Sequence, residues 1–203
     1  MFNYLIRVKL PDRPGALGAV ASRIGSVGGD VVSIDILQRG TRSVVDELGV
    51  GLASDKLIDL LRDEVLEVDG VSIESVRAVE GPMPDRDTEL LDMAAEVFKG
   101  TPPLGLMEHL TSRVRRCLGA TFATVVEHGG SEMVTCDGEA PEGFDPGEGP
   151  GGLTDRLDLA VAPMALARKL LIVGRLDPVL RNRERQWVST MAGLADYGFR
   201  LAD

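Results

Sequence analysis

The feature that most constrains the fold is a change of hydrophobic period near the start of the chain. Apolar residues alternate over residues 4–10, which is the period of a β-strand. They then recur at helical spacing over residues 17–27, and Gly28 and Gly29 supply a C-terminal stop. Only the short segment PDRPG separates the two patterns. This part of the chain therefore predicts a strand, a tight loop and a helix.

The following residues predict two more strands, a second helix and a last strand. Alternation over residues 32–36 and 44–52, joined by QRGTRS, is typical of a hairpin. Ser54 and Asp55 suit the start of a helix that carries apolar residues over 57–65, and residues 71–79 predict a strand. The order βαββαβ is that of a ferredoxin-like fold, an antiparallel sheet with both helices on one face.

The other face of that sheet has no predicted cover. The apolar side chains expected on it are those of Leu5, Val31, Leu37 and Val45. An exposed apolar face favours association. We therefore expect self-association, as a homodimer, or docking on the second half of the chain.

The stretch VKLPDRPGALGAVASRIGSVGGDVVSIDI, residues 8–36, resembles the ACT domain, a regulatory module that binds amino acids and related metabolites. The resemblance covers residues 3–79, and its most specific part is DRPG at 12–15 followed by a leucine. It implies paired modules with the ligand between them. The ligand-binding residues that it implies are Asp12, Arg13, Pro14, Gly15, Ala16 and Leu17, with Asp30, Val31 and Val32 opposite.

The residues of the loop between the first predicted strand and helix can themselves bind charged groups, independently of the resemblance. Pro14 fixes its own φ and Gly15 has no side chain, so the first N–H groups of the helix stand open to an anion. Asp12 and Asp30 offer carboxylates to an ammonium group. The alternatives are that Asp12 caps the helix, that Arg13 is a solvated loop charge and that Pro14-Gly15 serves only the turn.

The resemblance also contains a departure. Members that bind amino acids often carry Asn where Asp12 and Asp30 stand. Two carboxylates near one ligand repel each other and disfavour an anionic ligand, unless Arg13 offsets them.

The segment EGPMPDRDTE, residues 80–89, combines prolines, a glycine and charges. It predicts a first domain over 1–80, a linker over 81–89 and a second domain over 90–203. The elements expected in the second domain are helices over 90–98 and 104–118, a hairpin over 120–138, strands over 157–164 and 169–174, and a helix over 181–201.

This order, with LLIVGRLDPVLRNRERQWVSTMAGLA at 170–195, resembles a small GAF-type sensory domain. The resemblance implies an α/β domain with an antiparallel sheet, and no site residue is carried over from it. The whole chain is therefore expected in the α+β class.

Two other patterns in the second half are interpreted as structural. The spacing Gly147-x-Gly149-x-x-Gly152 matches a dinucleotide loop, but it neither follows a strand nor opens a clear helix, so we interpret it as a chance match within an irregular loop. The basic residues of RNRERQ (181–186), with Arg175 nearby, favour a solvated helix face.

Composition disfavours several classes of function. The net charge is −10 without a basic block, which disfavours nucleic-acid binding. We find no apolar run of about 18 residues and no signal-peptide pattern, so a soluble, cytoplasmic protein without membrane contact is expected. Cys117 and Cys136 lack metal-site spacing, and buried free thiols are expected. No metal and no cofactor is predicted.

His109 and His128 have no companion residues in the pattern of a catalytic triad. The sequence therefore predicts a non-catalytic regulatory protein, a small-molecule sensor that binds an amino acid or related metabolite and acts through an unidentified protein partner. The alternative is a ligand-independent interaction or regulatory subunit of a metabolic enzyme. A third hypothesis is an enzyme in the second domain.

Overall fold

The computed structural model describes residues 1–130, 132–146 and 157–202. The chain divides into two compact units, Met1–Met83 (unit 1) and Pro84–Asp203 (unit 2). Both α-helices and β-strands are present, with one four-stranded antiparallel sheet in each unit. Among the described residues, no helix is long and apolar enough to cross a membrane. The glycine spacing at 147–152 lies outside the described residues.

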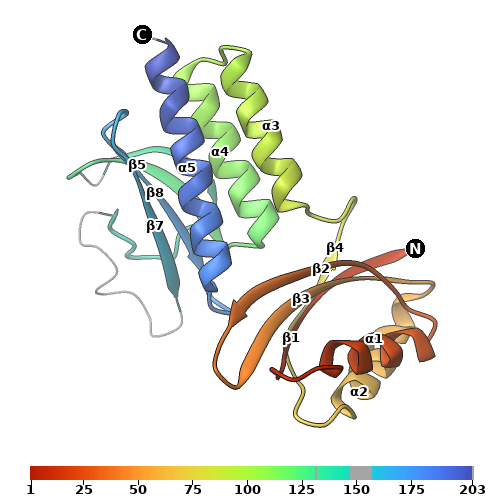
Figure 1. Ribbon diagram of the computed structural model, residues 1–203. Coiled ribbons are helices and arrows are strands. Elements are labelled where there is room, and N and C mark those ends of the chain that lie inside the picture. The colour runs from red at the N-terminus through yellow and green to blue at the C-terminus, as the bar shows by residue number, and fades with distance from the viewer. Residues whose placement is uncertain (131, 147–156, 203) are drawn as a thin grey trace. The chain divides into compact units, whose positions relative to one another are not determined.

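Unit 1 has the predicted βαββαβ order (Figure 1). Its elements are β1 (Phe2–Pro11), α1 (Ala16–Ser26), β2 (Asp30–Arg39), β3 (Ser43–Leu52), the 3₁₀ turn η1 (Asp55–Leu57), α2 (Ile58–Leu66) and β4 (Ser72–Val79). The strand order β2-β3-β1-β4, with antiparallel neighbours, is that of a ferredoxin-like sheet. The prediction of this fold is confirmed.

The core of unit 1 forms because alternate residues of β1, and nearly all the corresponding residues of β3, are apolar and face the helices. Ile6 lies opposite Leu48 in the register of the two strands, and both side chains are fully buried. Helix α1 packs Val20 and Ile24 into the same cluster, and α2 contributes Leu61 and Val65, a pair with the same i,i+4 spacing. Figure 1 shows both helices on one face of the sheet.

One of the apolar side chains that the sequence predicts on the face away from the helices lies on the other face. The sequence pattern places Val31 on the face away from the helices, but its side chain packs against the helix-side core. The ladder between β2 and β3 shifts register between Val31 and Ser33. A bulge of this kind changes which residues face the helices. Strict alternation of apolar and polar residues in the sequence does not show where such a bulge occurs. Leu5, one residue out of phase with Ile6, does lie on the predicted face.

Unit 2 has helices before and after an antiparallel sheet, as predicted. Its elements are α3 (Arg86–Phe98), α4 (Pro103–Leu118), β5 (Phe122–Glu127), β6 (Met133–Gly138), β7 (Asp158–Met164), β8 (Lys169–Arg175) and α5 (Asn182–Ala202). The strand order is β6-β5-β8-β7. Figure 1 shows α3, α4 and α5 packed side by side.

Helix α3 begins earlier than the sequence pattern indicates. Its first residue, Arg86, falls inside the stretch 81–89 that is predicted as a linker. The cause is Asp85, whose carboxylate accepts hydrogen bonds from the backbone N–H groups of Asp87 and Thr88. An aspartate in this position satisfies donors that would otherwise have no partner at the helix start.

The sequence pattern predicts that Arg175 belongs to a solvated basic face, and this prediction is wrong. Its side chain is 3% exposed and donates two hydrogen bonds to the carboxylate of Glu184, at 2.8 and 3.1 Å. It also donates to the carbonyl of Leu118 at 2.9 Å. Glu184 accepts a further bond from the backbone N–H of Arg181. This bidentate pair fixes the start of α5 to β8.

Gly174 gives a test of the packing in unit 2. A side chain at Gly174 would overlap the ring of Phe122, its partner across the β5–β8 ladder. We expect Gly174→Ala to lower the free energy of unfolding by about 2 kcal/mol or more, measured by urea denaturation. The control is Gly193→Ala in α5, where nothing lies within 4 Å. It should raise stability by about 0.5 kcal/mol. Equal effects of the two changes would contradict this packing.

Candidate functional site

The loop between β1 and α1 turns through a left-handed backbone conformation at Gly15. This residue has a φ of 85° and directly precedes Ala16, the first residue of the helix. Glycine adopts this φ without the steric cost that a side chain brings. No side chain among the described residues caps α1. The N–H of Ala16 donates to the carbonyl of Arg13 at 3.3 Å, so the N–H groups of the first turn that are open to a ligand are those of Leu17 and Gly18.

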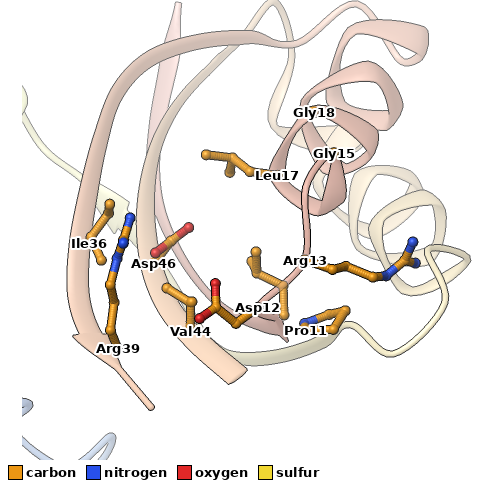
Figure 2. A pocket seen from close by; sticks show the side chains of 11 residues that line it. Pro11, Asp12, Arg13, Gly15, Leu17, Gly18, Ile36, Arg39, Val44 and Asp46 are labelled. Atoms are coloured by element: carbon orange, nitrogen blue, oxygen red, sulfur yellow. The ribbon is translucent and has the colours of Figure 1, made fainter. Parts of the chain in front are cut away.

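A cavity of about 160 Å³, which we call the α1 cavity, lies beside this helix end (Figure 2). The loop and the first turn of α1 form one side of it. Strands β2 and β3 form the other side, with Ile36, Arg39, Val44 and Asp46. A cavity of about 150 Å³ accommodates a molecule of the size of benzene. The α1 cavity therefore suits a small metabolite.

Asp46 is the most buried charged residue of the α1 cavity. It is 2% exposed, whereas Asp12, Arg13 and Arg39 are exposed. Its Oδ1 atom has no hydrogen-bond partner among the residues that the structure describes. Burial raises the pKa of the Asp46 carboxyl group, and the positive charge of Arg39 partly opposes this shift. A buried acceptor without a donor is costly, and a ligand that donates a hydrogen bond would remove that cost.

The side chains around the cavity differ in direction. Figure 2 shows the carboxylates of Asp12 and Asp46 and the side chain of Leu17 pointing into the space between α1 and the strands. The Arg13 side chain points away from that space. Arg39, rather than Arg13, is thus the positive charge whose field reaches Asp46.

The cavity brings together part of the predicted ligand site. Asp12, Arg13, Gly15 and Leu17 line it. Pro14 is exposed in the loop but does not line the cavity, and Ala16 is 2% exposed and belongs to the helix-side core. The loop prediction therefore identifies one wall of the cavity.

Asp30, Val31 and Val32 lie at the far end of the same sheet. Strands β1 and β2 both pair antiparallel with β3, so they run parallel to each other, and Asp30 and Asn3 both pair with Gly51. The length of β2 is roughly 30 Å. Asp30 and Asp12 of one copy therefore do not share a site. A contribution of these residues from a paired copy stays a prediction.

Sequence reasoning missed Asp46, although the pattern contains a signal for it. The phase of β3 that faces the helices contains Val44, Leu48, Val50 and Leu52, and Asp46 is the one charged residue in that phase. An aspartate in an apolar phase is rarely buried without a specific reason. Its proximity to Arg39 follows from the register of the β2–β3 hairpin, which the sequence does not give.

A larger cavity, of about 350 Å³, lies at the other end of unit 1 and is lined by residues 1–4 and 78–81. Glu80 is its one acidic side chain, and none of the buried unpartnered side-chain atoms of the described residues belongs to its lining. Volume alone does not make a recognition site. The α1 cavity is therefore the candidate.

The cysteines differ from each other. Cys117 is buried as predicted, but Cys136 is exposed. Partial burial of the Cys136 thiol raises its pKa, its hydrogen bond with Thr124 acts in the opposite direction, and the charge of Asp137 adds to the rise. A raised pKa lowers the fraction of reactive thiolate. Within the described ranges, no group of three or more His, Cys, Asp or Glu side chains is placed to hold a metal ion.

Comparison with known proteins gives low similarities. No protein-family model and no curated protein matches the chain. A GAF domain from Pseudomonas syringae pv. tomato is 13% identical, with a TM-score of 0.45 over 57% of this chain and 86% of that chain. An ACT domain protein from Streptococcus pneumoniae is 18% identical, with a TM-score of 0.33 over 38% and 89%.

A third solved structure is the ACT domain from GTP pyrophosphokinase of Chlorobium tepidum. It is 17% identical, with a TM-score of 0.31 over 40% of this chain and 90% of that chain. GAF and ACT domains are thus among the similar structures, at low scores. The fold of each unit follows from its own strand order and not from these similarities.

The state of Asp46 predicts an unusual effect on stability. Asp46→Asn should raise the free energy of unfolding at neutral pH by about 1 kcal/mol or less, because it removes a buried charge whose Oδ1 lacks a donor. The pKa of Asp46 is higher in the folded than in the unfolded protein, so the folded state binds more protons between the two values. The contribution of Asp46 to the free energy of unfolding of the wild type therefore falls as the pH rises through that interval.

Urea unfolding of the wild type and Asp46→Asn, from acidic to neutral pH, measures this difference. It should grow as the pH rises. The matched control is Asp63→Asn on α2, where the aspartate is exposed. A neutral-pH loss of stability in Asp46→Asn that the control does not show would mean that the carboxylate has partners in the folded protein.

Proposed function

We propose that this chain is a non-catalytic regulatory protein that binds an amino acid, or a closely related small metabolite, in the α1 cavity. The observation that carries the proposal is the uncapped start of α1 beside two carboxylates. Open N–H groups at a helix start attract a carboxylate. The Asp12 and Asp46 carboxylates attract an ammonium group. A free amino acid carries both groups a short distance apart.

The size and lining of the cavity support the same ligand class. Its volume of about 160 Å³ lies below the roughly 300–1,000 Å³ of pockets that hold larger ligands. Leu17, Ile36 and Val44 provide apolar contacts for a small aliphatic group. Among the described residues, the lining contains no Ser, Cys, His or Lys side chain that would act as a nucleophile. These features support binding without covalent chemistry.

We also propose a homodimer through the unit 1 sheet and a further protein partner that receives the signal. Strand β2 is an edge of that sheet, and Val32 and Ile34 on it are about half exposed, at 47% and 50%. Edge strands with exposed apolar residues favour pairing with another chain. A cytoplasmic location belongs to this proposal, since both cysteines are free thiols.

Ligand binding predicts a measurable stabilisation. A small amino acid should raise the melting temperature of the wild type in a thermal-shift screen of the twenty amino acids. Asp12→Asn should weaken that ligand about tenfold in calorimetric titration, because it removes one charged acceptor. Arg13→Ala is the control, because its side chain points away from the cavity, and it should change the affinity less than about twofold. A flat response to all twenty amino acids would contradict the proposal.

The alternative, a ligand-independent regulatory subunit, has a separate outcome. Affinity purification with and without the amino acid from the screen compares recovery of the protein partner. Ligand-dependent recovery supports the sensor. A partner recovered equally in both conditions, together with no ligand in the screen, supports the subunit.

A further inference from the structure

We propose that Asp46 binds the ammonium group of the ligand and that one copy of the protein contains a complete amino-acid site. The inference rests on the proposed function, because it takes the α1 cavity as the ligand site. It differs from the expectation that the carboxylate opposite the loop is Asp30 of a paired copy. It assigns that role to a residue on β3 of the same copy.

The first support is that Asp46 is poised for a donor. Its residue exposure is 2%, and its Oδ1 accepts no hydrogen bond within the described part of the chain. Folded proteins rarely retain such a group unless a ligand or water satisfies it. A primary ammonium carries three donors and a positive charge, and thus offers the hydrogen-bond donor that the Oδ1 atom lacks.

The second support is the balance of charge around the cavity. The charged residues that line it with Asp46 are Asp12 and Arg13, from the loop, and Arg39, from β2. The lining residues of α1 are Leu17 and Gly18, and neither is charged. Because the Arg13 side chain points away, two carboxylates face one guanidinium. This balance favours a ligand with a cationic group over a simple anion.

The third support is the orientation that Asp46 at one end of the site and the start of α1 at the other would impose on a ligand. Asp46 lies on β3, across the cavity from the loop and the uncapped start of α1. An α-amino acid would place its ammonium at Asp46 and its carboxylate at the α1 N–H groups. Its side chain would contact Ile36 and Val44, which favour an aliphatic group.

The geometry of the sheet separates this site from Asp30. Asp30 pairs with Gly51 near the end of β3, whereas Asp46 lies near its beginning. No group from the far end of the sheet is needed to supply the two acceptors and the helix N–H groups. Ligand binding should therefore not require association of two copies.

Calorimetric titration tests the assignment with the wild type, Asp46→Asn and Asp30→Asn. The probes are alanine, serine and valine, with ethylammonium and propionate as the separated halves of an amino acid. We expect Asp46→Asn to weaken the amino acid about tenfold or more and to abolish ethylammonium binding. Asp30→Asn should change either affinity less than about twofold. The affinity should stay constant over a roughly hundredfold range of protein concentration.

The outcomes separate the inference from the proposed function. Amino-acid binding that survives Asp46→Asn, or is lost in Asp30→Asn, overturns the assignment and leaves the proposed function standing. Affinity that rises with protein concentration overturns the single-copy site. A wild type that binds none of the probes and also shows a flat response to all twenty amino acids in the thermal-shift screen overturns both. Melting curves of each variant establish that it is folded.

A readout on the wild type needs no substitution. The carboxyl carbon of Asp46, followed by NMR during a pH titration, should titrate at lower pH in the presence of saturating alanine, because an ammonium stabilises the charged form. An unchanged titration of Asp46 in the alanine-bound protein would overturn the assignment.

Discussion

The unit 1 sheet depends on the packing of the apolar side chains that alternate along β1 and β3 against two helices. Among these side chains, Ile6 and Leu48 lie opposite each other, under Val20 and Ile24 of α1. The same alternation continues toward the beginning of β3, where Asp46 takes an apolar position. The α1 cavity lies where this packing gives way to a carboxylate. The candidate site is thus an interruption of the core and not an addition to the surface.

This placement connects stability with function. A buried carboxylate oxygen without a donor opposes folding, and the rest of the core has to compensate for it. Groups that are unfavourable in the unbound protein are common in binding sites, because the ligand supplies the missing interaction. The glycine at position 15 has a related effect, since its left-handed conformation exposes the start of α1 without a side-chain cap. The proposed binding chemistry therefore depends on two local departures from good packing and capping.

Sequence reasoning reaches the order of the elements because period and turn residues are local signals. Residues 4–10 and 17–27 show different periods, and the predicted strand and helix are confirmed. The side of the sheet that Val31 faces depends on a bulge between two strands, and the partners of Arg175 depend on contacts with distant segments. Neither is present in a local pattern. For the site, the loop residues can be predicted from the sequence. Asp46 has a local signal, a charge among alternating apolar residues, but its place beside Arg39 depends on the register of the β2–β3 hairpin.

The most direct measurement is a crystal structure of the protein with a bound small amino acid. We expect the ligand in the α1 cavity, with its carboxylate at the N–H groups of Leu17 and Gly18 and its ammonium within hydrogen-bond distance of Asp46 Oδ1. A ligand held between two copies, with its ammonium against Asp30 and with Asp46 still lacking a donor, would contradict it.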